Sequence, residues 1–410
     1  MKVYLAPCGM GVGHVSRCRP IADSLIERGR SIAVSTYSSG LEYAQRLGYP
    51  TVQTVPLWLK ADDLSGVDFK LTAATSPGFF RGLWSIISQI VAEIRNIRRF
   101  RPAVVVSDTR LSSLVAAKLL MVPSVVILNQ FRVKIPRRPS KGSMRPLDKI
   151  FFVIANVVWW LVSVVVGWIW CLADMILIPD LPPPHTISSG NLAIPRNCAS
   201  KVEFLGPLIK RPSRNPSKPT TRDQLGYNSN QPIILVALSV SPGEGRQFVG
   251  RVEKILENLP SRYQIVMSRG KVSGSLHAER KGNLTVYDWI SNLDEYLEIC
   301  DLVVGRAGQV TIMSSIAHGK PLLLIPVPDH PEQLGNARRA LELGVANVLS
   351  VEELTMNSLA SAIDRMLRSP EYRDRLAEIA EHAYRIGGLE RAITIVEELS
   401  RKSGDLAKSA

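Results

Sequence analysis

A glycine-rich turn that ends on a histidine is the first feature of this 410-residue chain that could carry chemistry. The turn lies in CGMGVGHVSR, residues Cys8–Arg17, behind the apolar run MKVYLAP. Gly11, Gly13 and Arg17 could hold a phosphate there, because backbone N–H groups at a helix N-terminus bind anions. The spacing differs from the GxGxxG dinucleotide fingerprint, and the next strand ends in STYSSG without an acidic residue, so NAD is not expected. His14, at such a turn, is a candidate general base.

An acidic residue, Asp108, is expected at the same edge of the sheet as His14. It ends the stretch VVVSD, and the carboxyl ends of parallel strands share one edge of a sheet. A carboxylate at this position could orient the imidazole and stabilise its protonated form. Asp is also a favoured N-cap for the helix expected next, and the sequence leaves both roles open.

A second glycine turn lies in GRAGQVTIMSSIAHGKPLLLIPVPDHPEQLGNA, residues 305–337. A strand is expected to end at Gly305, and Arg306 follows it at the turn into a helix. The free N–H groups of that helix predict a second anion site, built from Gly308, Gln309, Val310 and Thr311. Beyond the following strand, a carboxylate and an amide suited to sugar hydroxyls are offered by Glu332 and Gln333.

The elements that position these residues are strands alternating with helices, a pattern that predicts α/β domains with parallel sheets. The expected strands are residues 2–6, 31–37, 51–56, 103–108, 124–130 and 175–180, then 233–239, 262–268, 284–288, 301–306, 321–327 and 345–350. We expect two doubly wound, Rossmann-like domains facing each other across a cleft, in residues 1–207 and 232–385, with a linker in 208–231. The C-terminal helix and tail, residues 386–410, are expected to pack back on the N-terminal domain.

An apolar segment, residues 150–173, interrupts the N-terminal domain. It has no charged residue and holds four of the seven tryptophans. Its length fits a transmembrane helix, but a full span would place strands of one sheet on opposite sides of the bilayer. We therefore expect a membrane-associating segment that dips into or lies on one leaflet. A helix buried against the sheet and a true span remain alternatives.

The formal net charge of +14 is concentrated in two runs, residues 131–149 and 196–222, each with seven basic residues and one acidic residue. Neither run interleaves aromatic residues for base stacking, so a nucleic-acid partner is not expected. The first run directly precedes the apolar segment. That order favours docking on an anionic membrane surface over a free basic loop.

The cysteines and aspartates bear on three further features, namely disulfides, structural zinc and a nucleotide-bound metal. The five cysteines are scattered and form no CxxC pair, so we expect no disulfide framework, no structural zinc and a reducing cytosol. No two aspartates are separated by one residue, so the Asp-x-Asp motif that chelates a nucleotide-bound metal is absent. We therefore expect neither a metal nor a cofactor.

The motifs GMGVGH, VVSD and the block from GRAGQVTI to DHPEQLGNA together resemble those of GT-B glycosyltransferases. The resemblance is strongest to MurG-like enzymes, which add N-acetylglucosamine to a lipid-linked acceptor, and extends to archaeal and UDP-glucuronosyltransferase-like relatives. It covers most of the chain. It implies inverting, metal-independent transfer from a UDP-sugar, with His14 as the general base and Asp108 as the residue that orients it.

The same resemblance assigns the donor site to the C-terminal domain. It implies uracil contacts near Ile290, a first glycine turn at Ser241 and Gly243, a diphosphate at Gly308 to Thr311, and sugar contacts at Glu332 and Gln333. Ser314 stands where the family usually has a glutamate for the ribose hydroxyls, and this departure leaves the nucleotide less certain than the fold.

The expected function is transfer of a sugar, with N-acetylglucosamine as the first choice, to a polyprenyl or dolichyl diphosphate sugar. The expected location is the cytoplasmic face of the cell membrane, with peripheral or monotopic attachment. The alternatives are a glycolipid-forming transferase, a UDP-sugar epimerase of the same fold, and an inactive membrane-bound partner protein. The sequence does not name the sugar, the acceptor head group, the linkage or the oligomeric state.

Overall fold

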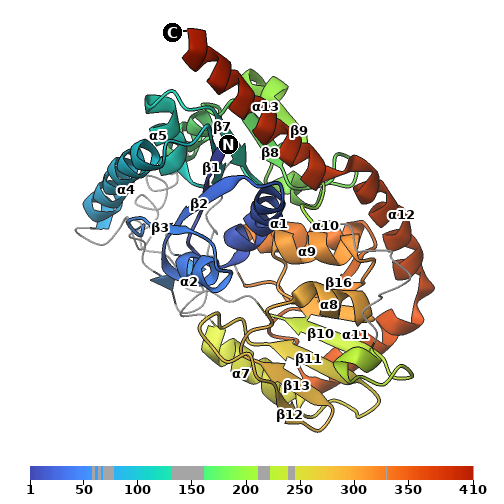
Figure 1. Cartoon of the computed structure of the whole chain (residues 1–410). Coiled ribbons are helices and arrows are strands. Elements are labelled where there is room, and N and C mark those ends of the chain that lie inside the picture. Colours follow the sequence, from blue (N-terminus) through green and yellow to red (C-terminus); the bar gives the residue numbers. More distant parts are fainter. Residues whose placement is uncertain are drawn as a thin grey trace, which may run out of the picture.

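The computed structural model describes residues 1–57, 61–62, 66–67, 78–131, 161–210, 222–238, 245–328 and 330–409. Two seven-stranded sheets form the cores of two halves, one above the other in Figure 1. This confirms the two doubly wound α/β domains that the sequence predicts.

The N-terminal sheet has the order β3-β2-β1-β6-β7-β8-β9, and its strands are parallel. The strands are β1 (Lys2–Pro7), β2 (Ser31–Thr36), β3 (Thr51–Gln53), β6 (Val104–Asp108), β7 (Ser124–Ile127), β8 (Met175–Ile178) and β9 (Val202–Phe204). The sequence predicted all of them except β9. A short antiparallel pair, β4 (Ala61–Asp62) with β5 (Gly66–Val67), lies apart from this sheet.

The N-terminal sheet is buried on both faces, which is why its strands are nearly continuous apolar runs. The helices of this half are α1 (Gly13–Glu27), α2 (Ser38–Arg46), α4 (Gly78–Phe100), α5 (Leu111–Leu119) and the helical residues 161–170. Two short 3₁₀ turns follow, η1 (Ile187–Gly190) and η2 (Arg196–Lys201).

The C-terminal sheet has the order β12-β13-β11-β10-β14-β15-β16. Its strands are β10 (Ile233–Ala237), β11 (Gln264–Ser268), β12 (Glu279–Lys281), β13 (Leu284–Tyr287), β14 (Leu302–Gly305), β15 (Leu322–Leu324) and β16 (Ala346–Val348), and β12 is antiparallel to β13. Around it lie η3 (Asp223–Leu225), α7 (Gly245–Leu256), α8 (Leu293–Ile299), α9 (Gln309–Ala317), α10 (Pro331–Glu342), α11 (Met356–Arg368) and α12 (Pro370–Ile386).

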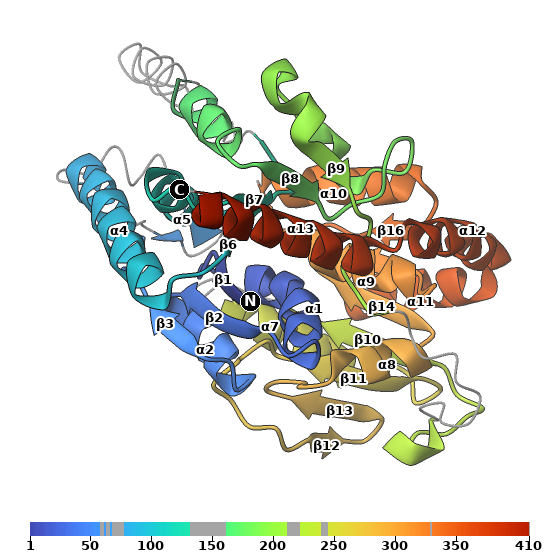
Figure 2. The same ribbon diagram turned by 45° about the horizontal axis from the view of Figure 1, so that its top comes forward.

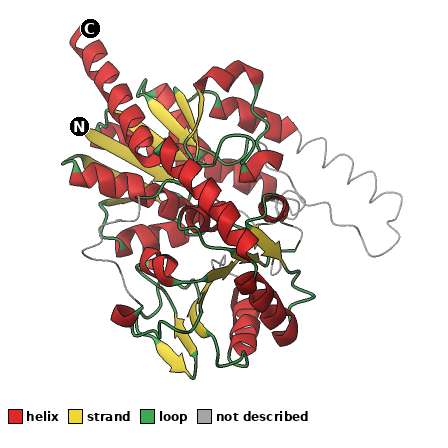
Figure 3. Ribbon diagram, turned by 90° about the vertical axis from the view of Figure 1, so that its right-hand side faces the viewer, coloured by secondary structure: helices red, strands yellow, loops and turns green. Residues whose placement is uncertain are grey.

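The last helix, α13 (Gly388–Ser409), crosses from the C-terminal half to the N-terminal half, as Figures 1 and 3 show. Its apolar face joins the N-terminal core with β1 and β6, through Leu389, Ala392, Ile393, Ile395 and Val396. The crossing needs a glycine at Gly388, because a Cβ there would collide with the Leu205 carbonyl. Arg391 adds an ion pair with Glu203, with 2.6 Å between Nε and Oε1.

Helix α4 packs on the sheet with polar side chains along most of its length and with Ile97 near its C-terminus, and it turns a set of apolar side chains outward. Its inner face carries Gln89 and Glu93, which are 1% and 0% exposed. Glu93 pairs with the buried guanidinium of Arg110 and accepts hydrogen bonds of 2.8 Å from the hydroxyls of Tyr4 and Ser35. The buried ion pair is thus fully hydrogen-bonded, the condition under which such a pair is tolerated in a protein core.

Glu93→Gln is expected to lower the free energy of unfolding by about 3–5 kcal/mol, because Arg110 would stay buried without a counter-ion. Urea unfolding followed by circular dichroism measures this. The matched control is Glu342→Gln, whose carboxylate is solvent-exposed and pairs with Arg338 and Arg339 of the same helix, and it should unfold like the wild type. A Glu93→Gln midpoint equal to that of the control would contradict the account of α4 packing.

Two expectations about the apolar segment are tested by the described residues. Residues 150–160 lie outside them, and residues 161–170 form a helix whose Trp170 is buried in the N-terminal core. Within the described ranges, no helix combines the length and apolarity needed to cross a bilayer. The sequence predicted no disulfide framework, and the structure corrects this for one pair, since Cys171 after this helix is bonded to Cys198 in η2. The two cysteines are 27 residues apart and belong to no sequence motif, so only the tertiary fold brings them together.

Candidate functional site

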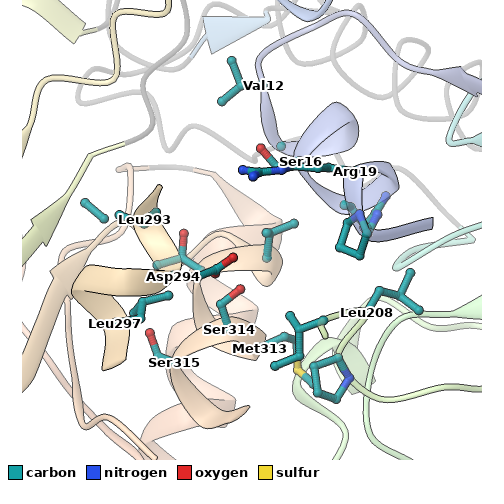
Figure 4. Close-up of a pocket in the computed structure, with 18 of the residues that line it drawn as sticks. Val12, Ser16, Arg19, Leu208, Leu293, Asp294, Leu297, Met313, Ser314 and Ser315 are labelled. Carbon is teal, nitrogen blue, oxygen red and sulfur yellow. The ribbon is translucent and has the colours of Figure 1, made fainter. Parts of the chain in front are cut away.

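The carboxyl ends of the central strands of both sheets approach one another at the junction of the two halves. In the N-terminal sheet β1 and β6 are neighbours, with Pro7 opposite Asp108. In the C-terminal sheet β10 and β14 are neighbours, with Ala237 opposite Gly305. A cavity of about 380 Å³ lies between these edges. Figure 4 shows Val12, Ser16 and Arg19 on one side of it and residues of α8 and α9 on the other. Ligands of open α/β sheets bind at such edges.

The structure brings the two candidate catalytic residues into contact. His14 lies in the first turn of α1, and its Nδ1 is 2.7 Å from Oδ1 of Asp108, the last residue of β6. Asp108 is fully buried, whereas the His14 side chain is 25% exposed. When Nδ1 donates its proton to the carboxylate, Nε2 holds a lone pair and can accept a proton from a substrate. This is the geometry of a general base with an orienting carboxylate.

Arg17 holds the same carboxylate from its other side. Its Nε donates to Oδ2 of Asp108 at 2.7 Å, and its NH2 donates to Oδ1. Burial alone would raise the pKa of Asp108, but the charges of Arg17 and His14 bring that pKa well below its ordinary value. The Asp108 carboxylate is therefore ionised at neutral pH. The sequence predicted that Arg17 binds phosphate. In the structure its Nε and NH2 groups bind the Asp108 carboxylate instead.

The turn that carries His14 depends on glycine at two positions, for two different reasons. A Cβ at Gly9 would overlap the Tyr37 carbonyl, so only glycine fits there. Gly11 has a φ of +76°, in the left-handed region, and its N–H donates to the Ser39 hydroxyl at 3.2 Å. Of the two glycines predicted to hold phosphate, Gly13 lines the cavity and Gly11 does not.

The opposite wall of the cavity is formed by the start of α9 and by the loop before α8. Gly308 is the N-cap of α9 and makes no side-chain cap, so the first N–H groups of the helix lack intrahelical partners. The cavity is lined there by Gln309, Val310 and Thr311, together with Ile290 from the loop. These predicted donor residues thus share one cavity with Gly13 and Arg17.

Other predicted donor residues lie outside this cavity. Glu332, at the start of α10, accepts a 2.7 Å hydrogen bond from the Asn129 side chain of the N-terminal half. Gln333 accepts from the Val327 N–H at 2.9 Å. Arg306 donates to the Ile325 carbonyl, and its guanidinium lies 3.8 Å from the centre of the Phe248 ring. Two further residues, Ser241 and Gly243, fall outside the described part of the chain.

Sequence reasoning missed several residues around the cavity. Arg19 of α1 reaches across it to the Ser291 carbonyl at 3.4 Å, and Asp294 of α8 lines the far wall (Figure 4). Ser314 of α9, which the resemblance placed at the ribose, lines the same wall. Asn129 was also missed. It follows β7 at the same sheet edge as Asp108, so the rule that the carboxyl ends of parallel strands share one edge could have found it.

In sequence comparisons the chain is similar to glycosyltransferases. Residues 243–386 match the glycosyltransferase family 28 C-terminal domain. An uncharacterized glycosyltransferase of Methanosarcina acetivorans is 25% identical over 99% of this chain and 100% of its own length. One from Methanopyrus kandleri is 28% identical over 72% of this chain and 78% of its own length. The UDP-N-acetylglucosamine–N-acetylmuramyl-(pentapeptide) pyrophosphoryl-undecaprenol N-acetylglucosamine transferase of Lactobacillus helveticus is 29% identical over 43% of this chain and 50% of its own length.

Solved structures resemble the chain over nearly its whole length. The glycotransferase of kitacinnamycin superposes with a TM-score of 0.65, at 18% identity, over 97% of this chain and 98% of its own. The calicheamicin glycosyltransferase CalG4 gives 0.62 at 18% identity, over 98% of both chains. MurG of Acinetobacter baumannii gives 0.53 at 14% identity, over 97% of this chain and 100% of its own.

Proposed function

Because this chain is a glycosyltransferase of the GT-B fold, with a C-terminal domain of the family 28 type, we propose that it moves a sugar from a UDP-sugar to a lipid-linked acceptor at a membrane surface. The observation that carries the proposal is the pairing of His14 with Asp108 next to the cavity between the two domains. N-acetylglucosamine is the first choice of sugar, because MurG-like relatives transfer it.

The donor is proposed to lie along the C-terminal wall of the cavity. Ile290, which lines the cavity from the loop before α8, would border the uracil. The N-terminus of α9 would take the diphosphate, since unpaired N–H groups and the helix dipole both favour negative charge. No carboxylate stands at Ser314, so the ribose would meet a hydroxyl at this position. Glu332 and Gln333 would contact the sugar if the halves close further.

The acceptor is proposed to enter from the N-terminal side, where its phosphate would meet the turn at Gly13. His14 Nε2 takes the proton from the acceptor hydroxyl as that oxygen bonds to C1 of the donor sugar. The bond from C1 to the diphosphate oxygen breaks, and UDP leaves with the electron pair. Asp108 stabilises the imidazolium formed in this step. A single displacement of this kind inverts the configuration at C1.

The leaving diphosphate is proposed to be stabilised without a metal. The helix N-terminus supplies preorganised N–H donors for the developing charge. Transfer should therefore persist in EDTA.

The test is a donor screen with a membrane lipid extract in the presence of EDTA. Each labelled UDP-sugar is incubated with the purified chain, and the label that enters the lipid fraction is counted. We expect one UDP-sugar to label the lipid. Conversion of the nucleotide sugar to its epimer without lipid labelling would contradict the proposal and favour an epimerase.

The membrane surface is proposed to bind the outward apolar face of α4. This face carries Leu83, Trp84, Ile87 and Val91, and Trp84 is 70% exposed. A second exposed apolar set lies on residues 161–172, where Trp168 is 69% exposed. Figure 2 shows both helices on the N-terminal half, away from the C-terminal sheet. With the two basic runs of the sequence, these faces fit an anionic leaflet, into which apolar side chains insert while basic ones contact the headgroups.

Trp84→Glu with Ile87→Glu is expected to lower the affinity of the chain for vesicles containing anionic lipid by about 100-fold or more. Each substitution removes an apolar side chain whose burial is worth about 1.5–3 kcal/mol. Sedimentation with vesicles measures this. The matched control is Leu334→Glu with Leu341→Glu on α10, two exposed apolar residues of the C-terminal half. Equal sedimentation of both variants would contradict the assignment of α4 as the membrane-binding face.

A further inference from the structure

Arg17 connects the catalytic pair with the donor domain. Its Nε and NH2 hold Asp108, while its NH1 lies 3.4 Å from the side-chain oxygen Oε1 of Gln309. Both residues are almost completely buried, with Arg17 5% and Gln309 3% exposed. Arg17 belongs to α1 of the N-terminal half and Gln309 is the first residue of α9. The contact therefore crosses the junction between the two halves.

Gln309 is anchored to the N-terminal half at both ends of its amide. Its Oε1 faces Arg17, and its Nε2 donates to the Pro179 carbonyl just beyond β8. The backbone N–H of the same residue belongs to the helix N-terminus that borders the cavity. One residue thus fixes the start of α9 relative to the strand ends that carry the catalytic pair.

We propose that Arg17 and Gln309 are positioning residues, which rests on the proposed function: Arg17 keeps His14 and Asp108 ready for proton transfer, and Gln309 aligns the donor helix with them. The contacts form a continuous chain from His14 through Asp108 and Arg17 to Gln309. Its ends are the proton acceptor and the N-terminus proposed to hold the leaving diphosphate. Those two groups must be aligned with the reacting carbon between them, because displacement requires attacking and leaving oxygens on opposite sides.

The charge of Arg17 has a second consequence for His14. The Arg17 NH2 is 3.2 Å from His14 Nδ1, so the guanidinium opposes the protonated imidazole before the reaction. The Asp108 carboxylate, in contrast, favours the protonated imidazole, and the charge of Arg17 keeps this carboxylate ionised. The other titratable groups at this site are the Cys18 thiol, 3.7 Å from Asp108 Oδ2, and the Glu332 carboxylate, which acts on Arg17 through space. Burial and Asp108 raise the pKa of Cys18, so this thiol stays neutral and adds no charge.

The test compares Arg17→Gln, Arg17→Lys and Gln309→Met with the wild type. Two readouts are used, the pH dependence of kcat/KM and the titration of the His14 imidazole followed by NMR in the substrate-free chain. Arg17→Gln removes the opposing charge and should move the acid limb and the NMR midpoint to higher pH. Arg17→Lys keeps the charge but loses the planar fork, so it should lower kcat about tenfold while the acid limb stays in place. If Arg17→Gln does not fold, Arg17→Lys still tests the role of Arg17 through its kcat.

Gln309→Met preserves the volume of the side chain and removes both of its polar contacts across the junction. It should lower kcat about tenfold and leave the acid limb and the NMR midpoint unchanged, because no charge near His14 is altered. A merely structural role would lower the stability of each variant without moving the pH profile or the kcat of the folded fraction.

Two results would overturn the inference: a wild-type NMR midpoint in Arg17→Gln, or wild-type kcat in both Arg17→Lys and Gln309→Met. A wild-type chain that transfers no sugar would instead contradict the proposed function. The substrate-free titration would then still decide the role of Arg17, so the two failures are distinguishable.

Discussion

His14→Ala is expected to lower kcat for sugar transfer by about 10²–10⁴-fold, the usual contribution of a positioned general base. The affinity for UDP should be unchanged, since the cavity residues proposed to hold the nucleotide belong to the C-terminal half. Turnover is measured by label entering the lipid fraction, and UDP affinity by calorimetry.

The matched control for this variant is His277→Ala, an exposed histidine between β11 and β12. It should transfer sugar at the wild-type rate. A His14→Ala chain that keeps kcat within about threefold of the wild type would rule out His14 as the base. Loss of UDP affinity in that variant would show that the histidine supports donor binding instead.

Asp108→Asn is expected to lower both activity and stability. An amide that turns its oxygen to one partner turns its NH2 group toward the other, so it cannot accept from both His14 and Arg17. Replacing the orienting carboxylate of a catalytic histidine by an amide costs about 10⁴-fold in kcat in the serine protease triad, and we expect a loss of this order here. The free energy of unfolding should fall by about 3–5 kcal/mol, because Arg17 is left buried without a counter-ion.

The pH dependence of stability checks the same assignment. The pKa of Asp108 is lowered in the folded chain, so its contribution is fully present above its unfolded pKa of about 3.9. That contribution is lost as the pH falls through the folded pKa. The stability difference between wild type and Asp108→Asn should therefore be greatest above about pH 4 and shrink at lower pH. Glu93→Gln is the control for a lost buried ion pair, and it should lose stability while the folded fraction keeps wild-type kcat.

The pairing of His14 with Asp108 could be predicted because it follows from topology. Two neighbouring parallel strands must bring their carboxyl ends together, and Pro7 indeed lies opposite Asp108. The contact of Arg17 with Asp108 could also have been predicted, since Arg17 lies one turn after His14 on the same face of α1. The sequence nevertheless favoured a free phosphate ligand, because the charge partner of Arg17 is 91 residues away.

The outward face of α4 could not be predicted from periodicity. The helix is amphipathic, but a hydrophobic pattern does not say which face packs on the sheet. The answer comes from Arg110 in the loop after β6, which requires a buried counter-ion and finds it in Glu93. The direction of Arg306 was unpredictable for a similar reason, since Phe248 lies on α7, far from it in sequence.

The most direct test of the central claim is the configuration at C1 of the transferred sugar. The purified chain is given the UDP-sugar found in the donor screen and a lipid-linked acceptor, and the anomeric proton of the product is examined by NMR. UDP-sugars of the N-acetylglucosamine type are α-linked, and attack by a hydroxyl activated at His14 Nε2 inverts this centre in one step. The account predicts a β-linked product from the wild type and none from His14→Ala. An α-linked product would contradict it, because retention requires a different mechanism from a single base-assisted displacement.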